Sequence, residues 1–170
     1  TKKAKSISPP VLARPEQLPL SDPNFSWEKF EAFCHEFVSS LENVEEVHHY
    51  GKRGNFQRGI DLVAKLRDGR KWVFQCKQRK KFTPAQARKA VSATTYKADR
   101  YILLLTCEAT IDVRDEIAKH SDWNLWDVRD ISMNVRNLPE DVARSLVETH
   151  FGSAWRVTFL GLAASMPFIS

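Results

Sequence analysis

Cysteine and long apolar runs are scarce in this chain of 170 residues. Its three cysteines, Cys34, Cys76 and Cys107, are far apart and form neither a Cys-X-X-Cys motif nor a Cys/His spacing typical of zinc sites. We interpret them as reduced thiols in the core of a cytoplasmic protein. No segment approaches the ~18 apolar residues of a membrane helix, and the start of the chain does not resemble a signal peptide. Internal repeats and low-complexity tracts are also absent, which excludes a repeat protein.

Hydrophobic residues make up 42% of the chain, which is enough for one globular domain with a sizeable core. We expect that domain to span residues 25–150. Residues 1–24 contain five of the eight prolines, so we expect them to form a tail or a strap. Residues 151–170 are too apolar for a free tail, and they either cover the core or begin a further domain. A chain that begins with Thr1 in place of methionine indicates an excised fragment or a processed product.

Positive charge is concentrated in one part of the sequence. Residues 50–100 hold 15 lysines and arginines against three acids, a net charge of +12. Because the whole chain carries +5, the remainder carries −7. Such a concentration attracts a polyanion and predicts salt-sensitive binding to a phosphate backbone. The alternative is a solvated basic surface that has no function.

A β-hairpin is predicted for residues 59–77, because two runs of β-branched, aliphatic and aromatic residues flank an Asp-Gly dipeptide at 68–69. Alternate side chains of a strand share a face, so Gln75 and Lys77 point to the same side. A turn at 68–69 also brings Asp61 level with Gln75. The sequence therefore predicts that Asp61, Gln75 and Lys77 lie together. The side chains expected on the opposite face, toward the core, are Trp72, Phe74 and Cys76.

This trio of side chains has a chemical use. Mg²⁺ is bound in proteins by carboxylate and other oxygens together with several waters, and Asp61 and Gln75 offer part of that set. An ammonium group such as that of Lys77 can orient a water beside the ion and offset charge on a phosphate. A hairpin with ordinary polar residues on its solvated face is the alternative explanation.

An amphipathic helix is predicted next to the N-terminal segment, beginning at Asp22 and Pro23 or at Ser26. Glu31 lies at the margin of its apolar stripe, from which a carboxylate can reach a site at the edge of the core. The alternative for Glu31 is a boundary salt bridge. The apolar residues that recur at helical spacing are Trp27, Phe30, Phe33, Cys34, Phe37, Val38 and Leu41.

Polar and basic residues flank the hairpin on both sides in the sequence. Three of the six glycines lie in residues 51–59, and glycine allows the backbone to approach a phosphate closely. A mobile surface loop is the alternative for this segment. The residues predicted to contact a substrate are Lys52, Arg53, Gln57, Arg58, Gln78, Lys80 and Lys81.

Periodicity and capping signals predict the other helices and strands. A capping box at Thr83 and Gln86, with Pro84 between them, predicts a helix that runs to about Lys97. A run without alternation at 100–106 predicts a strand that is covered on both faces. The remaining predicted elements are a strand at 45–50, a helix at 111–120, a strand at 123–128 and a helix at 138–150.

The hairpin residues resemble the active-site motif of the PD-(D/E)XK nuclease superfamily, and more closely its Mrr-like restriction endonuclease family, in which Gly-Ile-Asp precedes Gln-X-Lys. Here Gly-Ile-Asp occupies 59–61 and Gln-Cys-Lys occupies 75–77, and the Phe-Glu pair at 30–31 is similar to one on the family's first helix. The resemblance covers residues 26–130. It implies a restriction endonuclease-like α/β fold with a three-layer core, in which a mixed sheet lies between helices.

The resemblance also implies the activity of a Mg²⁺-dependent DNA endonuclease, with Mn²⁺ as a substitute ion. Its metal ligands would be Asp61, Gln75, Glu31 and the backbone carbonyl of Cys76, while Lys77 would position the attacking water. Mrr-like modules often begin larger proteins, including bacterial antiviral ATPases, so the resemblance implies a restriction or antiviral defence role, as a homodimer or a fusion. The alternatives are a DNA-binding module that has lost catalysis and a nuclease for RNA or branched DNA.

Gln75 stands where the wider superfamily has an acid, and this changes what we expect of the metal. An amide oxygen can coordinate a hard cation but adds no charge, so weak Mg²⁺ binding is predicted until DNA supplies phosphate oxygens. On this basis Gln75→Glu adds a charge, and we expect it to tighten metal binding and to keep at least part of the activity.

Overall fold

A computed structural model describes residues 19–21, 25–50 and 59–161 of the chain. Helices and strands follow one another in the order α1, β1, β2, β3, α2, β4, α3, β5, α4, α5, α6. The strands are β1 (Val44–His49), β2 (Leu62–Leu66), β3 (Lys71–Lys77), β4 (Arg100–Leu105) and β5 (Trp123–Trp126). The helices are α1 (Trp27–Ser39), α2 (Pro84–Ala93), α3 (Ile111–Ala118), α4 (Val128–Arg136), α5 (Glu140–Phe151) and α6 (Ser153–Leu160).

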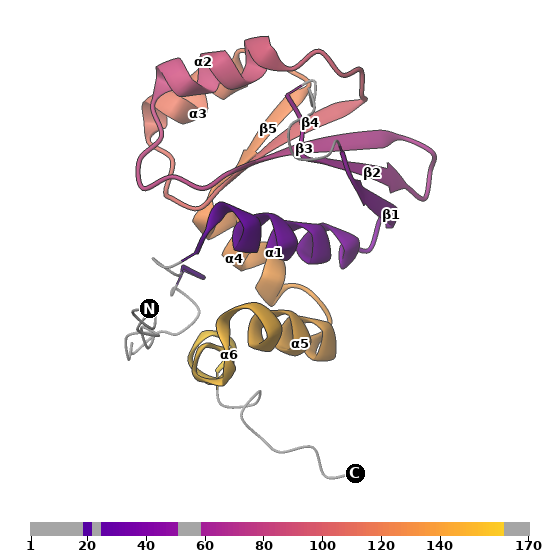
Figure 1. Cartoon of the computed structure of the whole chain (residues 1–170), viewed down its shortest axis with the longest axis vertical. Helices are drawn as coiled ribbons and strands as arrows, with labels where there is room; N and C mark the ends of the chain where they lie inside the picture. The colour runs from indigo at the N-terminus through magenta and orange to yellow at the C-terminus, as the bar shows by residue number, and fades with distance from the viewer. Residues whose placement is uncertain (1–18, 22–24, 51–58, 162–170) are drawn as a thin grey trace.

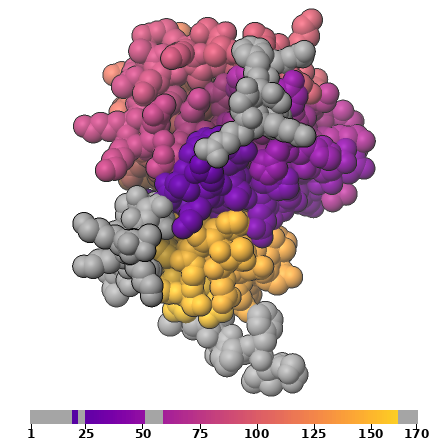
Figure 2. Space-filling view, in the orientation of Figure 1, coloured from indigo at the N-terminus to yellow at the C-terminus, as the bar shows by residue number. Residues whose placement is uncertain are grey.

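The five strands form one mixed sheet in the order β1-β2-β3-β4-β5 (Figure 1). β1, β2 and β3 pair antiparallel, whereas β3, β4 and β5 pair parallel. One hydrophobic cluster joins the sheet to α1 and α4, and a second joins the other face to α2 and α3. The predicted α/β fold, a mixed sheet between layers of helices, is therefore confirmed. α5 and α6 add a further layer against α1, drawn in orange to yellow in Figure 2.

The predicted hairpin is formed by β2 and β3. Its turn contains Gly69, whose φ of +89° is disfavoured for residues with side chains. Leu62 lies opposite Phe74 in the register, and the Asp61 N–H donates to the Phe74 carbonyl at 2.8 Å. The next position of this register brings Asp61 level with Gln75, as the sequence predicts.

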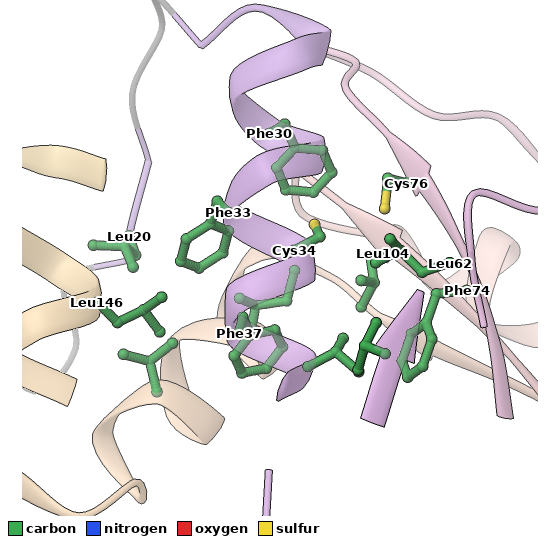
Figure 3. Close-up of a cluster of buried hydrophobic side chains, with 14 of the residues drawn as sticks. Leu20, Phe30, Phe33, Cys34, Phe37, Leu62, Phe74, Cys76, Leu104 and Leu146 are labelled. Carbon is green, nitrogen blue, oxygen red and sulfur yellow. The ribbon is translucent and has the colours of Figure 1, made fainter. Parts of the chain in front are cut away.

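The main core lies between α1 and the sheet (Figure 3). Most of the predicted apolar stripe of α1 is buried in it, but Trp27 is the exception, with 43% of its surface exposed. Trp72 of β3 is also only partly buried, packed against this core at its margin. The labelled side chains that meet here are Phe30, Cys34 and Phe37 from α1 with Leu62, Phe74, Cys76 and Leu104 from the sheet, whereas Phe33 lies on the side of α1 that faces Leu20 and Leu146.

All three cysteines are free, as predicted. Cys34 and Cys76 are buried in the main core, whereas Cys107 is half-buried. A hydrogen bond with Cys34, together with burial, raises the pKa of Cys76 well above its ordinary value. Cys76 is therefore a neutral core thiol, and its side chain lies on the face of β3 opposite to Gln75.

Helix α2 begins as predicted and ends earlier. Thr83 caps it, and the side chain of Gln86 completes the capping box. The helix was predicted to reach about Lys97, but it ends at Ala93, because Thr94 adopts an extended backbone conformation and its hydroxyl donates back to the Ala90 carbonyl at 2.8 Å. The prediction of the helix end was therefore wrong by about one turn.

The last strand is shorter than predicted, and a helix follows it directly. β5 ends at Trp126, whereas the prediction extended it to Val128. Asp127 is the N-cap of α4, because its side chain accepts the backbone N–H groups of Arg129 and Asp130. The Asp130 side chain accepts the Asp127 N–H in return, so the pair forms a capping box. α4 and α6 are the two helices that the sequence analysis did not predict.

The N-terminal side of the domain is tied to α1 and α4. Ser26 caps α1 by accepting the Lys29 N–H at 3.2 Å, whereas the other predicted start, Asp22 with Pro23, lies outside the described residues. The Leu20 N–H donates to the Ser132 hydroxyl of α4 at 2.8 Å. None of the helices in the described part of the chain is long and apolar enough to cross a membrane.

The C-terminal helix α6 packs into the main core. Trp155 and Phe159 are both buried there, while Val157 on the same helix is 36% exposed. Residues 162–170 lie outside the described residues. The division into a tail, a domain at 25–150 and a C-terminal extension stays a prediction.

Phe159→Ala is expected to lower the free energy of unfolding by about 3–5 kcal/mol, because it removes a fully buried aromatic ring. Val157→Ala removes a half-exposed side chain from the same helix and is the matched control, with an expected loss below about 1 kcal/mol. Urea unfolding followed by tryptophan fluorescence measures both. Equally small losses would show that α6 does not belong to the cooperative core.

Candidate active site

Asp61 immediately precedes β2 and is fixed to the strands on both sides of it. Its N–H donates to the Phe74 carbonyl at 2.8 Å, and its carbonyl accepts the Tyr50 N–H at 2.9 Å. Its side-chain Oδ2 accepts the Cys76 N–H of β3 at 2.7 Å. Both the backbone and the carboxylate are therefore held against the segment that contains Gln75 and Cys76.

The Gln75 side chain lies beneath α2 and is only 3% exposed. Its amide nitrogen donates to the Gly59 carbonyl, to the Thr94 hydroxyl at 2.8 Å and to the Ala90 carbonyl at 3.3 Å. Its Oε1 is buried and accepts no hydrogen bond from the described residues. A buried polar atom without a partner is unusual, and a bound ion or water can satisfy it.

Glu31 approaches from α1, with 17% of its side chain exposed. Its Oε1 lies 3.0 Å from Nδ1 of His49 at the end of β1. The His49 ring also stacks on His35 of α1, with the ring centroids 4.5 Å apart. Helix α1 therefore carries Glu31 and, through His35, also holds the histidine that Glu31 contacts. Oε2 of Glu31 is buried and, like Oε1 of Gln75, has no hydrogen-bond partner among the described residues.

A pocket of about 280 Å³ opens between the sheet and α2. Asp61, Gln75 and Lys77 line the sheet side of this pocket, and Lys89 lines its helix side. Arg79 and Gln86 also line it, so the lining holds three cations, one carboxylate and two amides. A larger, mainly apolar pocket of about 400 Å³ shares Arg79 with it but is lined by none of the four residues predicted to be catalytic. The smaller pocket is therefore the candidate active site.

Electrostatics link Asp61 to the groups around it. Burial raises the pKa of the Asp61 carboxyl above its ordinary value, the Cys76 N–H opposes this shift, and the charge of Glu31 adds to it. Lys77 and His49 lower the pKa of Asp61 to a smaller extent. Glu31 does not line the pocket, but its charge reaches Asp61 from the α1 side.

The donor set of the site suits a hard divalent cation. No group of three or more His, Cys, Asp or Glu side chains able to hold a metal occurs among residues 19–21, 25–50 and 59–161. The available donors are instead the Asp61 carboxylate and the two unpartnered oxygens of Gln75 and Glu31. Oxygen donors that include an amide and carboxylates are typical of Mg²⁺ sites, in which waters complete the shell.

The structure brings Asp61, Gln75 and Lys77 to one pocket, whereas Glu31 does not line the pocket and acts on Asp61 by raising the pKa of its carboxyl. The Cys76 backbone adjoins the Asp61 carboxylate. The predicted substrate contacts are less uniform, because the Gln78 amide donates to the Phe25 carbonyl at 2.9 Å, whereas both lysines that follow it are exposed. Those two lysines are Lys80 and Lys81. Four further predicted contacts lie outside the described residues, namely Lys52, Arg53, Gln57 and Arg58.

The sequence did not indicate the residues that form hydrogen bonds to the predicted site residues. Thr94 bonds the Gln75 amide and His49 bonds Glu31, and both contacts join elements far apart in the sequence. No local pattern indicates either contact. Arg79 and Lys89 of the pocket lie in the basic stretch but were not selected as site residues.

Residues 23–133 match the model of a family described as restriction endonuclease, Mrr_cat. Among solved structures, the chain is similar to "MspJI Restriction Endonuclease in Complex with 27-mer Oligonucleotide", with 15% sequence identity and a TM-score of 0.48. That similarity covers 74% of this chain and 33% of the other, so this chain spans a third of the length of that structure. No curated protein matches the chain.

Asp61→Asn is expected to stabilise the metal-free protein, and the gain should depend on pH. Because the folded protein raises the pKa of Asp61, ionisation of this carboxyl costs stability as the pH rises through that pKa. The free energy of unfolding of Asp61→Asn should therefore exceed that of the wild type near pH 7. The two free energies should converge below about pH 4, where the Asp61 carboxyl is protonated in both the folded and the unfolded protein. Urea unfolding with a chelator across this range measures the difference. A constant difference at all pH values would contradict the shift.

Proposed function

Because this chain belongs to the Mrr_cat family of restriction endonucleases through residues 23–133, we propose that it is a metal-dependent endonuclease that hydrolyses phosphodiester bonds in DNA. The observation that carries the proposal is the joint position of Asp61, Gln75 and Lys77 around one pocket. The two buried oxygens of Gln75 and Glu31 that lack partners in the described part of the chain support it. These are the residue types that a phosphate and a hard cation require together.

The residues that would hold a divalent cation are Asp61, Gln75, Glu31, directly or through water, and the backbone carbonyl of Cys76. Mg²⁺ is the proposed ion, with Mn²⁺ as a substitute. Such an ion, when bound, supplies an activated water and offsets negative charge on the phosphate. Asp61 contributes the ionised carboxylate, which the Cys76 N–H orients by a hydrogen bond of 2.7 Å.

Lys77 is proposed to position the attacking water and to balance charge on the phosphate. It shares the pocket with Arg79 and Lys89, which are proposed to bind the phosphates that flank the scissile bond. The N-terminus of α2 is held by its capping box beside the same basic segment. The chain's own groups thus place positive charge where DNA phosphates would lie.

The exposed residues Lys80 and Lys81 continue this basic surface beyond β3. Together with the predicted contacts in residues 51–58, they are proposed to bind the DNA backbone without reading its sequence. A restriction or antiviral defence role, a homodimer for cleavage of both strands, and fusion to a larger protein are further proposals that the family relationship supports.

Plasmid cleavage tests the reaction, the metal and the residues together. Asp61→Ala and Lys77→Ala are each expected to lower the rate of nicking of supercoiled DNA in Mg²⁺ by about 100-fold or more, because each removes a group that acts on the reacting phosphate. A chelator should abolish nicking by the wild type. Lys65→Ala, an exposed lysine of β2, is the control and should retain the wild-type rate.

An Asp61→Ala protein that nicks at the normal rate would remove the basis of the assignment. A wild-type protein that binds DNA and cuts nothing in Mg²⁺ or Mn²⁺ would instead support a binding module without catalysis. Cleavage of RNA or branched DNA in place of the plasmid would change the substrate and keep the chemistry.

The salt dependence of DNA affinity tests whether the basic residues bind the phosphate backbone. The double variant Lys80→Glu/Lys81→Glu is expected to weaken duplex binding and to lower the slope of log affinity against log salt by about 2. Arg129→Glu, on an exposed side chain outside the basic stretch, should leave both quantities nearly unchanged. Fluorescence anisotropy at several salt concentrations measures this. Affinity that does not change with salt would contradict the proposal.

A further inference from the structure

We propose that Thr94 is a positioning residue for Gln75 and that Thr94, with the carbonyls of Gly59 and Ala90, restricts position 75 to an amide. The inference deepens the proposed function and rests on it, because it assigns the Gln75 oxygen to a divalent cation. It departs from the expectation that a glutamate at this position would improve the site.

The orientation of the Gln75 amide follows from the groups around its nitrogen. The two N–H bonds of Nε2 face three acceptors, which are the carbonyls of Gly59 and Ala90 and the hydroxyl of Thr94. A carbonyl can only accept, so an amide turned by 180° would bring Oε1 against two carbonyl oxygens. The nitrogen is therefore fixed on this side, and Oε1 is left as the free acceptor.

Thr94 connects the amide to the end of α2. Its hydroxyl accepts from Gln75 at 2.8 Å and lies 2.8 Å from the Ala90 carbonyl, to which it donates. A hydroxyl has one proton, so these two bonds use its donor and one of its acceptor sites. Thr94 thus holds Gln75 and the helix end in one chain of hydrogen bonds.

Gly59 completes this enclosure from the strand side. Its φ of +77° is a conformation that residues with side chains rarely adopt. A Cβ at this position would lie 2.7 Å from the Ala93 carbonyl oxygen and 2.9 Å from the Thr94 hydroxyl oxygen. The close approach of Gly59 to Thr94 is what allows its own carbonyl to reach the Gln75 amide.

A carboxylate at position 75 would meet these acceptors without a proton to donate. The Thr94 hydroxyl can rotate and donate to it, but the carbonyls of Gly59 and Ala90 cannot. Because Gln75 itself is only 3% exposed, water cannot come between a carboxylate at this position and the two carbonyl oxygens without opening the packing of α2. Gln75→Glu should therefore destabilise the fold and displace the side chain, so the extra charge does not yield a better metal ligand.

The two parts of the proposal call for different variants. Gln75→Glu tests the restriction to an amide. Thr94→Val removes the hydroxyl at nearly constant shape, so the Gln75 nitrogen loses one of its three acceptors and its link to the end of α2, whereas Thr94→Ser keeps the hydroxyl. Thr95→Val alters the exposed neighbouring threonine and is the matched control.

Two measurements are made on each protein, which are thermal unfolding in chelator and calorimetric titration with Mn²⁺. Gln75→Glu is expected to lower the melting temperature by roughly 5 °C or more and to bind Mn²⁺ no more tightly than the wild type. Thr94→Val should weaken Mn²⁺ binding by about 10-fold or more, as is usual for the loss of a group that orients a ligand. The Mn²⁺ affinities of Thr94→Ser and Thr95→Val should stay within about threefold of the wild-type affinity, because both variants keep the hydroxyl that orients the Gln75 amide.

A Gln75→Glu protein as stable as the wild type, with tighter Mn²⁺ binding, would overturn the restriction to an amide. A Thr94→Val protein with unchanged Mn²⁺ affinity would overturn the positioning role. If the wild type binds no Mn²⁺, the metal assignment of the proposed function and the role of Thr94 fail together. The melting temperature of Gln75→Glu in chelator would still decide the restriction to an amide.

Discussion

The antiparallel pairing of the segment before β2 with β3 is the constraint on which the candidate site depends. The Asp61 N–H donates to the Phe74 carbonyl, and the Cys76 N–H donates to the Asp61 carboxylate. β3 is also the middle strand of the sheet, so one of its faces packs on the α1 core and the other lies beneath α2. The same strand therefore contributes to the stability of the domain and presents the polar groups. A shift of one residue in this register would exchange Phe74 with Gln75 between the two faces.

Local signals in the sequence were sufficient for most of the framework. The Asp-Gly turn predicts the hairpin, and the Thr83 capping box predicts the start of α2, because both depend on neighbouring residues only. α4 was missed although its signals are local. The apolar run that continues to Val128 was assigned to a strand, while the reciprocal capping of Asp127 and Asp130 and the later apolar positions of α4 indicate a helix. Attention to capping at the end of that strand would have found it.

The alternation of side chains predicted which residues share a face of β3. It did not predict which helix packs on that face. Gln75 was expected on the face of β3 opposite to the core, but α2 packs over it and makes it one of the few buried polar side chains among the described residues. The contacts of Gln75 with Thr94 and of Glu31 with His49 join different secondary-structure elements, so no local sequence pattern predicts them. For this reason the expected gain from Gln75→Glu was argued from charge alone. The structure adds the two carbonyl oxygens that oppose it.

The β2–β3 hairpin pairs residues that are close together in the sequence, and this affects the order in which the strands of a newly made chain can pair. Residues 59–77 can pair as soon as they leave the ribosome, because antiparallel neighbours close short loops, whereas the parallel pairing of β3 with β4 must wait for α2. The contact between Gln75 and Thr94 joins the hairpin to the far end of α2, so it requires the crossover to have docked on the sheet. A hairpin of two strands alone is at best marginally stable in water. The enclosure of the Gln75 amide is thus a property of the docked crossover and not of the hairpin by itself.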